Sequence, residues 1–289
     1  MISTPFEYSR ALSLDDALAK LRATNGEGKF IAGGHSLIPL MKLRLSEPKV
    51  LIDIARIPGL SGIRTKGDKI EIGAGTSHHD VASSALLQQV CPMMAEAAAA
   101  IGDPQVRNRG TLGGSLAHAD PAADYPAVML ALDAEIHVKG PKGWRMVHAH
   151  DFFRGLFTVD LAADEIIAGV QFNPVRSAAY AKLHQRASHF AIVGVAAALD
   201  VNNGVIRSAR IGLTGASSYA TRLKDVEEAL AGKALSMPNI EAAARLAGAL
   251  LEDVNSDIHA SQEYRRAMIP VFTERALKGA MSRALARAE

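Results

Sequence analysis

Short apolar runs alternate with polar, periodic stretches over the first 55 residues and predict four elements. Residues 13–21 carry leucines at helical spacing behind a serine that can cap a helix, with two aspartates in the first turn. Residues 29–32 and 50–54 are apolar runs of strand length, and a second helix is predicted between them, from Ser36 to about Arg44. Strands joined through a helix are expected to be parallel, so this segment is a β–α–β unit.

The middle of the chain predicts further strands. Residues 63–74 indicate a hairpin that turns at Lys66-Gly67-Asp68. Residues 134–138 and 165–172 have the length and apolar character of strands.

Helices are predicted between these strands, at residues 79–87 and 91–101. Residues 102–109 are predicted to be a polar loop. Another helix is expected to begin at Asp120-Pro121, because aspartate is a favoured cap and proline fits the first helical position.

From about residue 176 the pattern becomes a β-hairpin followed by helices. Residues 191–201 and 205–213 are apolar runs separated by Asn202-Asn203-Gly204, which is typical of a tight hairpin turn. Three later segments have helical spacing: residues 222–232, 239–254 and 261–287. This change predicts a separate C-terminal domain.

Two pairs of adjacent glycines stand where an apolar run meets a turn of small residues. They belong to Ala32-Gly33-Gly34-His35-Ser36 and to Thr111-Leu112-Gly113-Gly114-Ser115. Glycine allows close approach to the backbone, and the amide N–H groups of such turns bind phosphate without a side chain. Two turns of this kind predict one elongated anionic ligand held at both ends.

Neither pair fits a familiar nucleotide or nucleophile motif. A dinucleotide fingerprint needs G-x-G-x-x-G, and His78 stands where the third glycine should follow Gly73-Ala74-Gly75. No lysine completes a phosphate loop, and the residues around Ser36 lack the second glycine of a nucleophile elbow. Ser36 is therefore predicted to cap a helix or bind phosphate, and no catalytic residue is assigned.

Composition excludes several other classes of protein. The net charge of +2 over 289 residues gives no argument for nucleic acid or a membrane surface. The single cysteine, Cys91, excludes a disulfide framework and a cysteine-ligated iron–sulfur cluster within the chain. No signal peptide is visible and no apolar run reaches the roughly 18 residues of a spanning helix, so we expect a cytoplasmic protein that does not span a membrane.

Three side chains outside the glycine turns are candidates for ligand contacts. Asp124 is either a solvated helix-start charge or an acceptor for the hydroxyl groups of a ribose or ribityl chain. Lys182 is either a surface lysine or a cation that neutralises a phosphate or the electron-rich end of a flavin. Phe190 either packs in the core or covers a flat ring.

Two histidine pairs, His78-His79 and His148-Ala149-His150, invite a metal interpretation. Adjacent histidines point in different directions, and the second pair has no obvious third ligand or supporting shell. We therefore expect no metal at either pair.

Together these residues resemble the flavoprotein (medium) subunits of the molybdenum hydroxylases, in particular that of aerobic carbon monoxide dehydrogenase. The matching segments cover residues 32–37, 103–115, 120–124 and 180–182, and their order and spacing extend the resemblance over essentially the whole chain. The long segment from Asp103 to Ser115 is the most specific.

The resemblance implies an α+β fold with two domains. Residues 1–175 would form an FAD-binding PCMH-type (VAO-like) domain of two α/β subdomains, at about 1–56 and 57–175. Residues 176–289 would form a short antiparallel sheet and a three-helix bundle, as in the carbon monoxide dehydrogenase flavoprotein.

The resemblance also implies roles for individual residues. The two glycine turns would hold the FAD pyrophosphate, and Asp124 would contact the polar chain of the cofactor. Lys182 would lie near the flavin, and Ile167 would add an apolar or backbone contact. Related subunits bind FAD non-covalently, so no covalent link through His35 is expected.

This sequence departs from the family pattern at two places. Relatives commonly have isoleucine and asparagine where this chain has Leu112 and Ser115, and both changes keep the turn small. Relatives often have Gly-Asp-aromatic-Ala where this chain has Ser188-His189-Phe190-Ala191. The second departure changes the group expected to shield the flavin.

The implied function is electron transfer within a molybdenum hydroxylase. A large molybdopterin-containing subunit would oxidise the substrate, and a small subunit with 2Fe-2S clusters would pass electrons to FAD on this chain. The implied assembly is a dimer of heterotrimers, a heterohexamer. Two alternatives stay open: a self-contained FAD-dependent oxidoreductase of the cell-wall precursor reductase type, and a non-enzymatic nucleotide-binding module.

Overall fold

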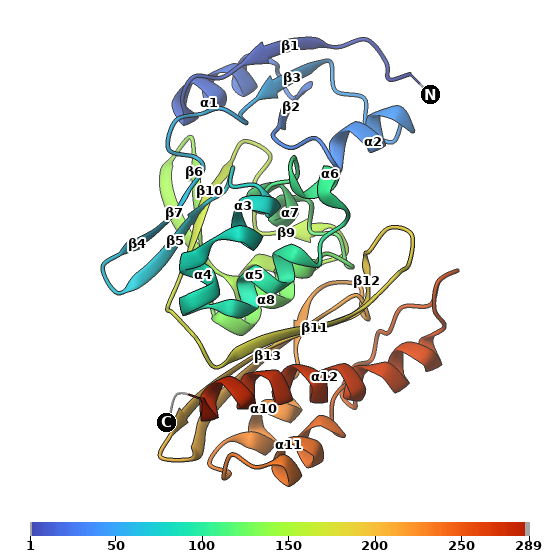
Figure 1. Ribbon diagram of the computed structural model, residues 1–289. Coiled ribbons are helices and arrows are strands. Elements are labelled where there is room, and N and C mark those ends of the chain that lie inside the picture. The colour runs from blue at the N-terminus through green and yellow to red at the C-terminus, as the bar shows by residue number, and fades with distance from the viewer. Residues whose placement is uncertain (1, 287–289) are drawn as a thin grey trace.

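The N-terminal part of the chain forms a small parallel sheet, in a computed structural model that describes residues 2–286 (Figure 1). Its strand order is β1-β3-β2, and all pairs are parallel. The predicted strands are confirmed as β2 (Gly28–Ile31) and β3 (Val50–Asp53), with α1 (Leu14–Ala23) and α2 (Leu37–Lys42) as the helices. The edge strand β1 (Glu7–Arg10) was not predicted, because its residues are polar and mostly exposed.

A five-stranded antiparallel sheet follows, in the order β4-β5-β10-β6-β7. Its strands are β4 (Ile63–Lys66), β5 (Lys69–Gly73), β6 (Glu135–Gly140), β7 (Gly143–His148) and β10 (Ile166–Phe172). The predicted hairpin and both predicted strands are confirmed. Strand β7 was missed because it lies at an edge with few buried side chains. A separate two-stranded hairpin joins β8 (Phe153–Gly155) to β9 (Thr158–Val159).

Seven helices of the described chain pack beside this sheet, and one of them, α7, contains the second glycine pair. They are α3 (His78–Ser83), α4 (Ala85–Val90), α5 (Pro92–Ala99), α6 (Pro104–Arg107), α7 (Leu112–His118), α8 (Asp124–Leu132) and α9 (Ala149–Phe152). Helix α8 is buried at every position because it packs in the first core, against α5 and against the C-terminal sheet.

Two local predictions in this region are wrong. The expected polar loop contains the short helix α6, because the Asp103 side chain accepts a hydrogen bond from the Val106 amide and caps it. The helix expected from Asp120 begins at Asp124 instead. The Asp120 carboxylate accepts from the amide of Ala122 at 2.8 Å, and so it closes a turn ahead of the helix rather than capping the helix.

The C-terminal domain is an antiparallel sheet with three helices. The sheet order is β11-β12-β13-β14, from β11 (Ala178–His184), β12 (Ala191–Asn202), β13 (Val205–Thr214) and β14 (Thr221–Arg222). The predicted hairpin turn is confirmed, with Asn203 and Gly204 both at positive φ (49° and 71°).

The three predicted helices are confirmed as α10 (Lys224–Leu230), α11 (Met237–Ala244) and α12 (Gln262–Leu285). Helix α11 ends well before the predicted residue 254. Residue 287, the predicted end of the last helix, lies outside the described residues.

Both faces of the C-terminal sheet are buried, which explains the long apolar run of β12. Ala196 and Ala198 face the first core with α8, whereas Val195 and Ala197 alternate to the second core with α12. Helix α12 lies along the outer face of this sheet (Figure 1). The α+β class is therefore confirmed. Within residues 2–286, no helix combines the length and apolarity that a bilayer crossing requires.

Candidate functional site

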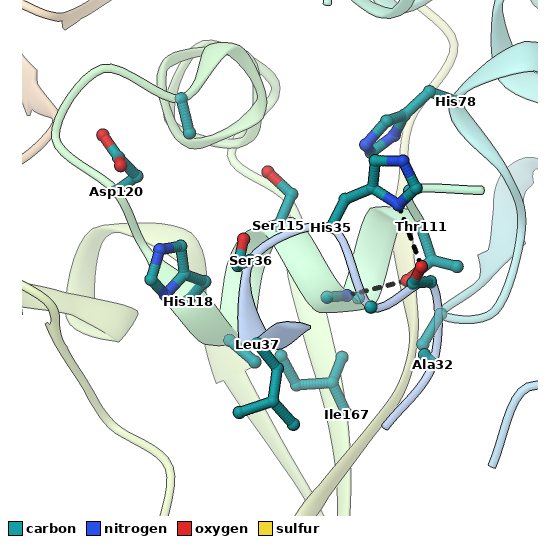
Figure 2. A pocket seen from close by; sticks show the side chains of 18 of the residues that line it. Ala32, His35, Ser36, Leu37, His78, Thr111, Ser115, His118, Asp120 and Ile167 are labelled. Carbon is teal, nitrogen blue, oxygen red and sulfur yellow. Dashed lines mark hydrogen bonds between the residues drawn. The ribbon is translucent and has the colours of Figure 1, made fainter. Parts of the chain in front are cut away.

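A cavity of about 460 Å³ lies between the parallel sheet and the helices α6 and α7. Its volume is in the range of small-molecule and cofactor sites. Figure 2 shows side chains from both glycine turns facing the same space. Most of the predicted contact residues line it: Ala32, Gly33, Gly34, His35, Ser36, Thr111, Gly113, Gly114, Ser115, Asp124, Ile167 and Phe190. Leu112 and Lys182 do not line this cavity.

The first glycine turn lies directly against the backbone of residues 109 and 110, just before the second glycine turn. A Cβ atom at Gly33 would overlap the carbonyl oxygen of Arg109 and would crowd Gly110 Cα at 2.8 Å. Gly34 has a φ of +74°, a left-handed conformation that glycine adopts without strain. The first turn therefore requires glycine twice, at Gly33 for close packing and at Gly34 for the backbone conformation.

The first turn lines the cavity and has a run of amide groups without an acceptor among residues 2–286. Within residues 2–286, the N–H groups of residues 33–37 donate to no protein acceptor, whereas the next amides of the helix are paired. Ser36 stands at the cap position of α2 but makes no side-chain capping bond, contrary to the capping prediction, so its hydroxyl is also free. Consecutive free amides of this kind form a concave anion site.

The second turn differs because its amides are already used. Leu112 donates to Thr76 O at 3.0 Å and Gly113 donates to Ala74 O at 2.8 Å. Gly114 donates to Thr111 Oγ1 at 3.1 Å, as part of the cap of α7. The second pair thus supplies a smooth wall of small residues rather than hydrogen-bond donors.

Asp124 and Lys182 form a buried ion pair. Lys182 Nζ lies 2.7 Å from Asp124 Oδ1 and donates to Ala100 O at 3.0 Å, while the Tyr180 hydroxyl donates to Asp124 Oδ1 at 2.6 Å. Burial raises the pKa of Asp124, against the opposing pull of the ammonium and the phenol. Lys182 is therefore no surface lysine, and it faces a second cavity, of about 520 Å³, that also includes Tyr180.

His78 is a cavity residue that sequence reasoning missed. Its ring lies 5.3 Å from that of Tyr125, and no acceptor or donor among the described residues reaches its buried Nδ1. Burial, with smaller contributions from His35 and Arg107, lowers the pKa of His78 to about 4. The cavity wall therefore holds a neutral imidazole, which no local sequence signal indicated.

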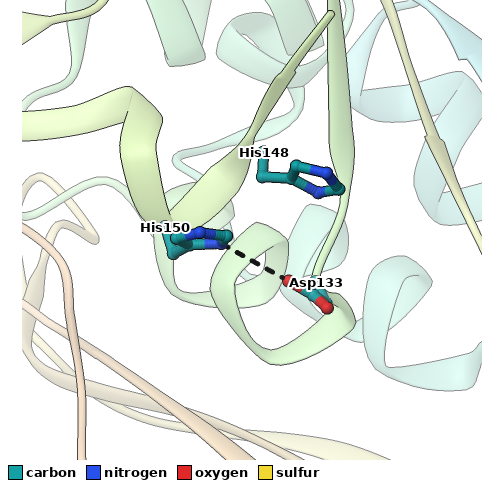
Figure 3. A group of neighbouring side chains, drawn as sticks. All are labelled: Asp133, His148 and His150. Carbon is teal, nitrogen blue, oxygen red and sulfur yellow. Dashed lines mark ion pairs between the residues drawn. The ribbon is translucent and has the colours of Figure 1, made fainter.

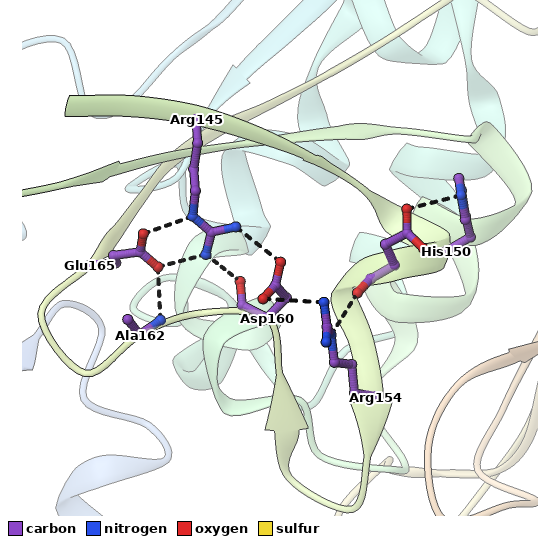
Figure 4. A network of polar contacts seen from close by, with 7 residues as sticks. Arg145, His150, Arg154, Asp160, Ala162 and Glu165 are labelled. Carbon is purple, nitrogen blue, oxygen red and sulfur yellow. Dashed lines mark hydrogen bonds and ion pairs between the residues drawn. The ribbon is translucent and has the colours of Figure 1, made fainter. Parts of the chain in front are cut away.

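An arginine network fixes the segment that leads to Ile167 (Figure 4). Arg145 on β7 donates to Glu165 through Nε at 2.7 Å and through Nη2 at 2.6 Å, and its Nη1 donates to Asp160 at 3.0 Å. Arg145 also lowers the pKa of Glu165. Glu165 lines the cavity, so the network neutralises this carboxylate and holds the start of β10 in place.

Comparison with known protein families identifies the class of this chain. Residues 4–174 match the family model described as the FAD binding domain in molybdopterin dehydrogenase, and residues 178–280 match the CO dehydrogenase flavoprotein C-terminal domain. The protein is thus an FAD-binding subunit of an oxidoreductase. More particularly, it belongs to the family of the FAD-binding medium subunits of the molybdenum hydroxylases.

Individual relatives are similar to this chain over nearly its whole length. The carbon monoxide dehydrogenase medium chain of Hydrogenophaga pseudoflava is 39% identical over 98% of this chain and 99% of its own. The nicotine 6-hydroxylase medium subunit of Paenarthrobacter nicotinovorans is 38% identical over 96% and 97%. Among solved structures, carbon monoxide dehydrogenase from Hydrogenophaga pseudoflava matches with a TM-score of 0.93 at 40% identity, covering 98% of this chain and 99% of that one.

The low pKa of His78 predicts an acid-sensitive fold. The unfolded chain takes up a proton near the ordinary value of 6.5, whereas the folded chain does so only near 4. Stability from this residue is therefore lost as the pH falls from about 6.5 to about 4, by up to about 3 kcal/mol. Urea unfolding at pH 7 and pH 5 should show a smaller loss for His78→Gln than for the wild type. The exposed neighbour His79→Gln is the matched control, and equal losses in all three proteins would contradict the account.

The buried ion pair predicts a large cost for removing one partner. Lys182→Met leaves Asp124 without its cation, and we expect the free energy of unfolding to fall by about 3–5 kcal/mol. The double variant Asp124→Asn, Lys182→Met should recover a substantial part of this loss, because no unpaired charge remains. Denaturant titrations of the three proteins measure both values. A loss below about 1 kcal/mol for Lys182→Met would show that the pair contributes no more to stability than an exposed ion pair does.

Proposed function

We propose that this chain is the electron-transfer subunit of a heteromeric molybdenum hydroxylase and binds FAD non-covalently in the cavity. The observation that carries the proposal is the run of free amides at residues 33–37, which faces a cavity inside the family's FAD-binding domain. When bound, FAD supplies two-electron redox chemistry. The chain would then accept electrons from a small 2Fe-2S subunit and release them to an external acceptor.

Each part of the cavity wall fits a different part of this cofactor. The amides of residues 33–37 and the Ser36 hydroxyl suit a pyrophosphate, since they offer several donors to one anion. The small residues Gly113 and Gly114 allow close approach on the opposite side. Phe190 is 47% exposed at the cavity, and an exposed aromatic ring there supports a role in covering the flavin.

The partners follow from the same family membership. Relatives with similar identity to this chain are named as medium chains or subunits of enzymes for carbon monoxide, nicotine and glyceraldehyde. The substrates differ although the medium chains are similar, which supports a medium chain that does not select the substrate. Substrate oxidation would then take place on a large molybdopterin-containing subunit. We propose a dimer of heterotrimers with that subunit and the 2Fe-2S subunit.

A single methyl group at Gly114 tests the cofactor site. A Cβ at Gly114 would meet only Thr111 Oγ1, at 2.8 Å, and alanine favours a helix more than glycine does. We expect Gly114→Ala to lose FAD affinity by about tenfold or more, because the methyl group reduces the close approach to the ligand. The capping Thr111 hydroxyl must shift to admit the methyl group, so urea unfolding of the variant is measured beside its FAD affinity. Titration of the flavin-free chain with FAD, followed by flavin fluorescence, measures the affinity.

Gly155→Ala is the matched control for that experiment, because it adds the same methyl group away from the cavity, with its nearest contact at 3.8 Å. Its FAD affinity should equal that of the wild type. Unchanged affinity in Gly114→Ala would place the ligand elsewhere. Flavin that stayed on the denatured chain would contradict non-covalent binding.

Purification from the native host tests the assembly. We expect the chain to be isolated with a larger molybdenum-containing subunit and a smaller iron–sulfur subunit in equal amounts. Native mass spectrometry and metal analysis report the stoichiometry. A flavin-loaded chain without these partners, active on an organic substrate by itself, would overturn the proposed assembly.

A further inference from the structure

A second polar cluster lies outside the FAD cavity, where Asp133, His148 and His150 come together (Figure 3). Asp133 ends α8, His148 ends β7, and His150 belongs to α9. One ligand atom from each side chain lies within 4.8 Å of the others. Sequence patterns showed no third ligand for the histidine pair, because Asp133 comes close to it only through the pairing of β6 with β7.

The ring nitrogens of this cluster lie near carboxylates or have no partner among residues 2–286. The Nε2 atom of His150 lies 3.1 Å from Asp151 Oδ2, so that carboxylate favours a proton on Nε2. The other ring nitrogen, Nδ1, lies 3.6 Å from Asp133 Oδ1. A proton on Nδ1 gives an ion pair here, and a divalent cation that takes the place of this proton would bind both atoms. The Nδ1 atom of His148 is also buried and has no partner among residues 2–286.

The charges around the cluster keep one carboxylate oxygen facing the histidines. Arg210 Nη2 lies 3.8 Å from Asp133 Oδ2, on the other side of the carboxylate. Asp133 is held in a left-handed conformation at φ 51°, and its amide donates to Leu130 O. The Ala149 amide donates to Ala134 O at 2.8 Å, which fixes the backbone between the two histidines relative to Asp133.

We propose that Asp133, His148 and His150 bind a divalent first-row transition ion, with Zn²⁺ as the probe. Imidazole nitrogen and carboxylate oxygen are zinc ligands, and three protein ligands leave a fourth position for water. Tetrahedral zinc requires ligand atoms about 3.3 Å apart, so the cluster must contract modestly. The side chains of His150 and Asp133 are 52% and 39% exposed and have room to do so. The ion would fasten the end of α8 to β7 and α9.

Zinc binding to the untagged, chelator-treated full chain tests this site. Equilibrium dialysis should give one Zn²⁺ per chain, and Asp133→Asn and His150→Gln should each weaken binding by about tenfold or more. His184→Gln is the matched control, because it removes a histidine that lies outside the cluster and is stacked on His189. Its zinc affinity should be unchanged.

Two further measurements separate ligand loss from misfolding. The metal-free variants should retain the wild-type circular dichroism spectrum and melting temperature. With Co²⁺ in place of Zn²⁺, the wild-type chain should give a visible absorption spectrum of a four-coordinate ion that both ligand variants lose. Absence of stoichiometric zinc in the wild type, or equal binding by the three variants, would overturn the proposal.

Discussion

The site depends on one backbone contact, between Gly33 and the carbonyl group of Arg109. This contact brings the turn after β2 against the segment between α6 and α7, and any side chain at Gly33 would force the two apart. The cavity is lined from both sides of this contact, by β2 and its turn on one side and by α7 on the other. The absence of a Cβ atom at Gly33 therefore allows the two segments that line the cavity to approach each other.

The two glycine pairs have different physical roles, although they look alike in sequence. Within residues 2–286, the amides of the first pair have no acceptor, whereas those of the second pair are bonded within the fold. The long motif before the second pair is likewise occupied with internal bonds. Asp103 caps α6, Arg107 donates to the carbonyl groups of Ile101 and Gly102, and Thr111 caps α7. The most specific family motif thus shapes the wall of the cavity, while the anion site that we propose lies at the less specific first turn.

Sequence patterns predicted the elements whose signals are local. The hairpin at Asn203-Gly204, the parallel pair β2 and β3, and the three C-terminal helices all carry capping, turn or spacing signals in their own residues. Strands β1 and β7 did not, because edge strands with exposed side chains lack an apolar pattern. The start of α8 was misplaced because a local turn at Asp120 competes for the same carboxylate.

The cavity residues likewise include some that carry a local sequence signal and some that do not. Glycine turns are visible in sequence because only glycine tolerates their geometry, and nearly all of the predicted contacts do line the cavity. The burial of Lys182 against Asp124 and the unpartnered ring of His78 were not predictable, because segments far apart in the sequence create both environments. Asp133 joins the histidine pair for the same reason.

Amide hydrogen exchange with and without FAD tests the central claim most directly. If the first turn is the anion site, FAD should slow exchange most strongly at residues 33–37, whose N–H groups are free without ligand. The amides of residues 112–115 should change less, because they are already hydrogen-bonded. FAD that binds tightly while exchange at residues 33–37 stays the same would contradict the account.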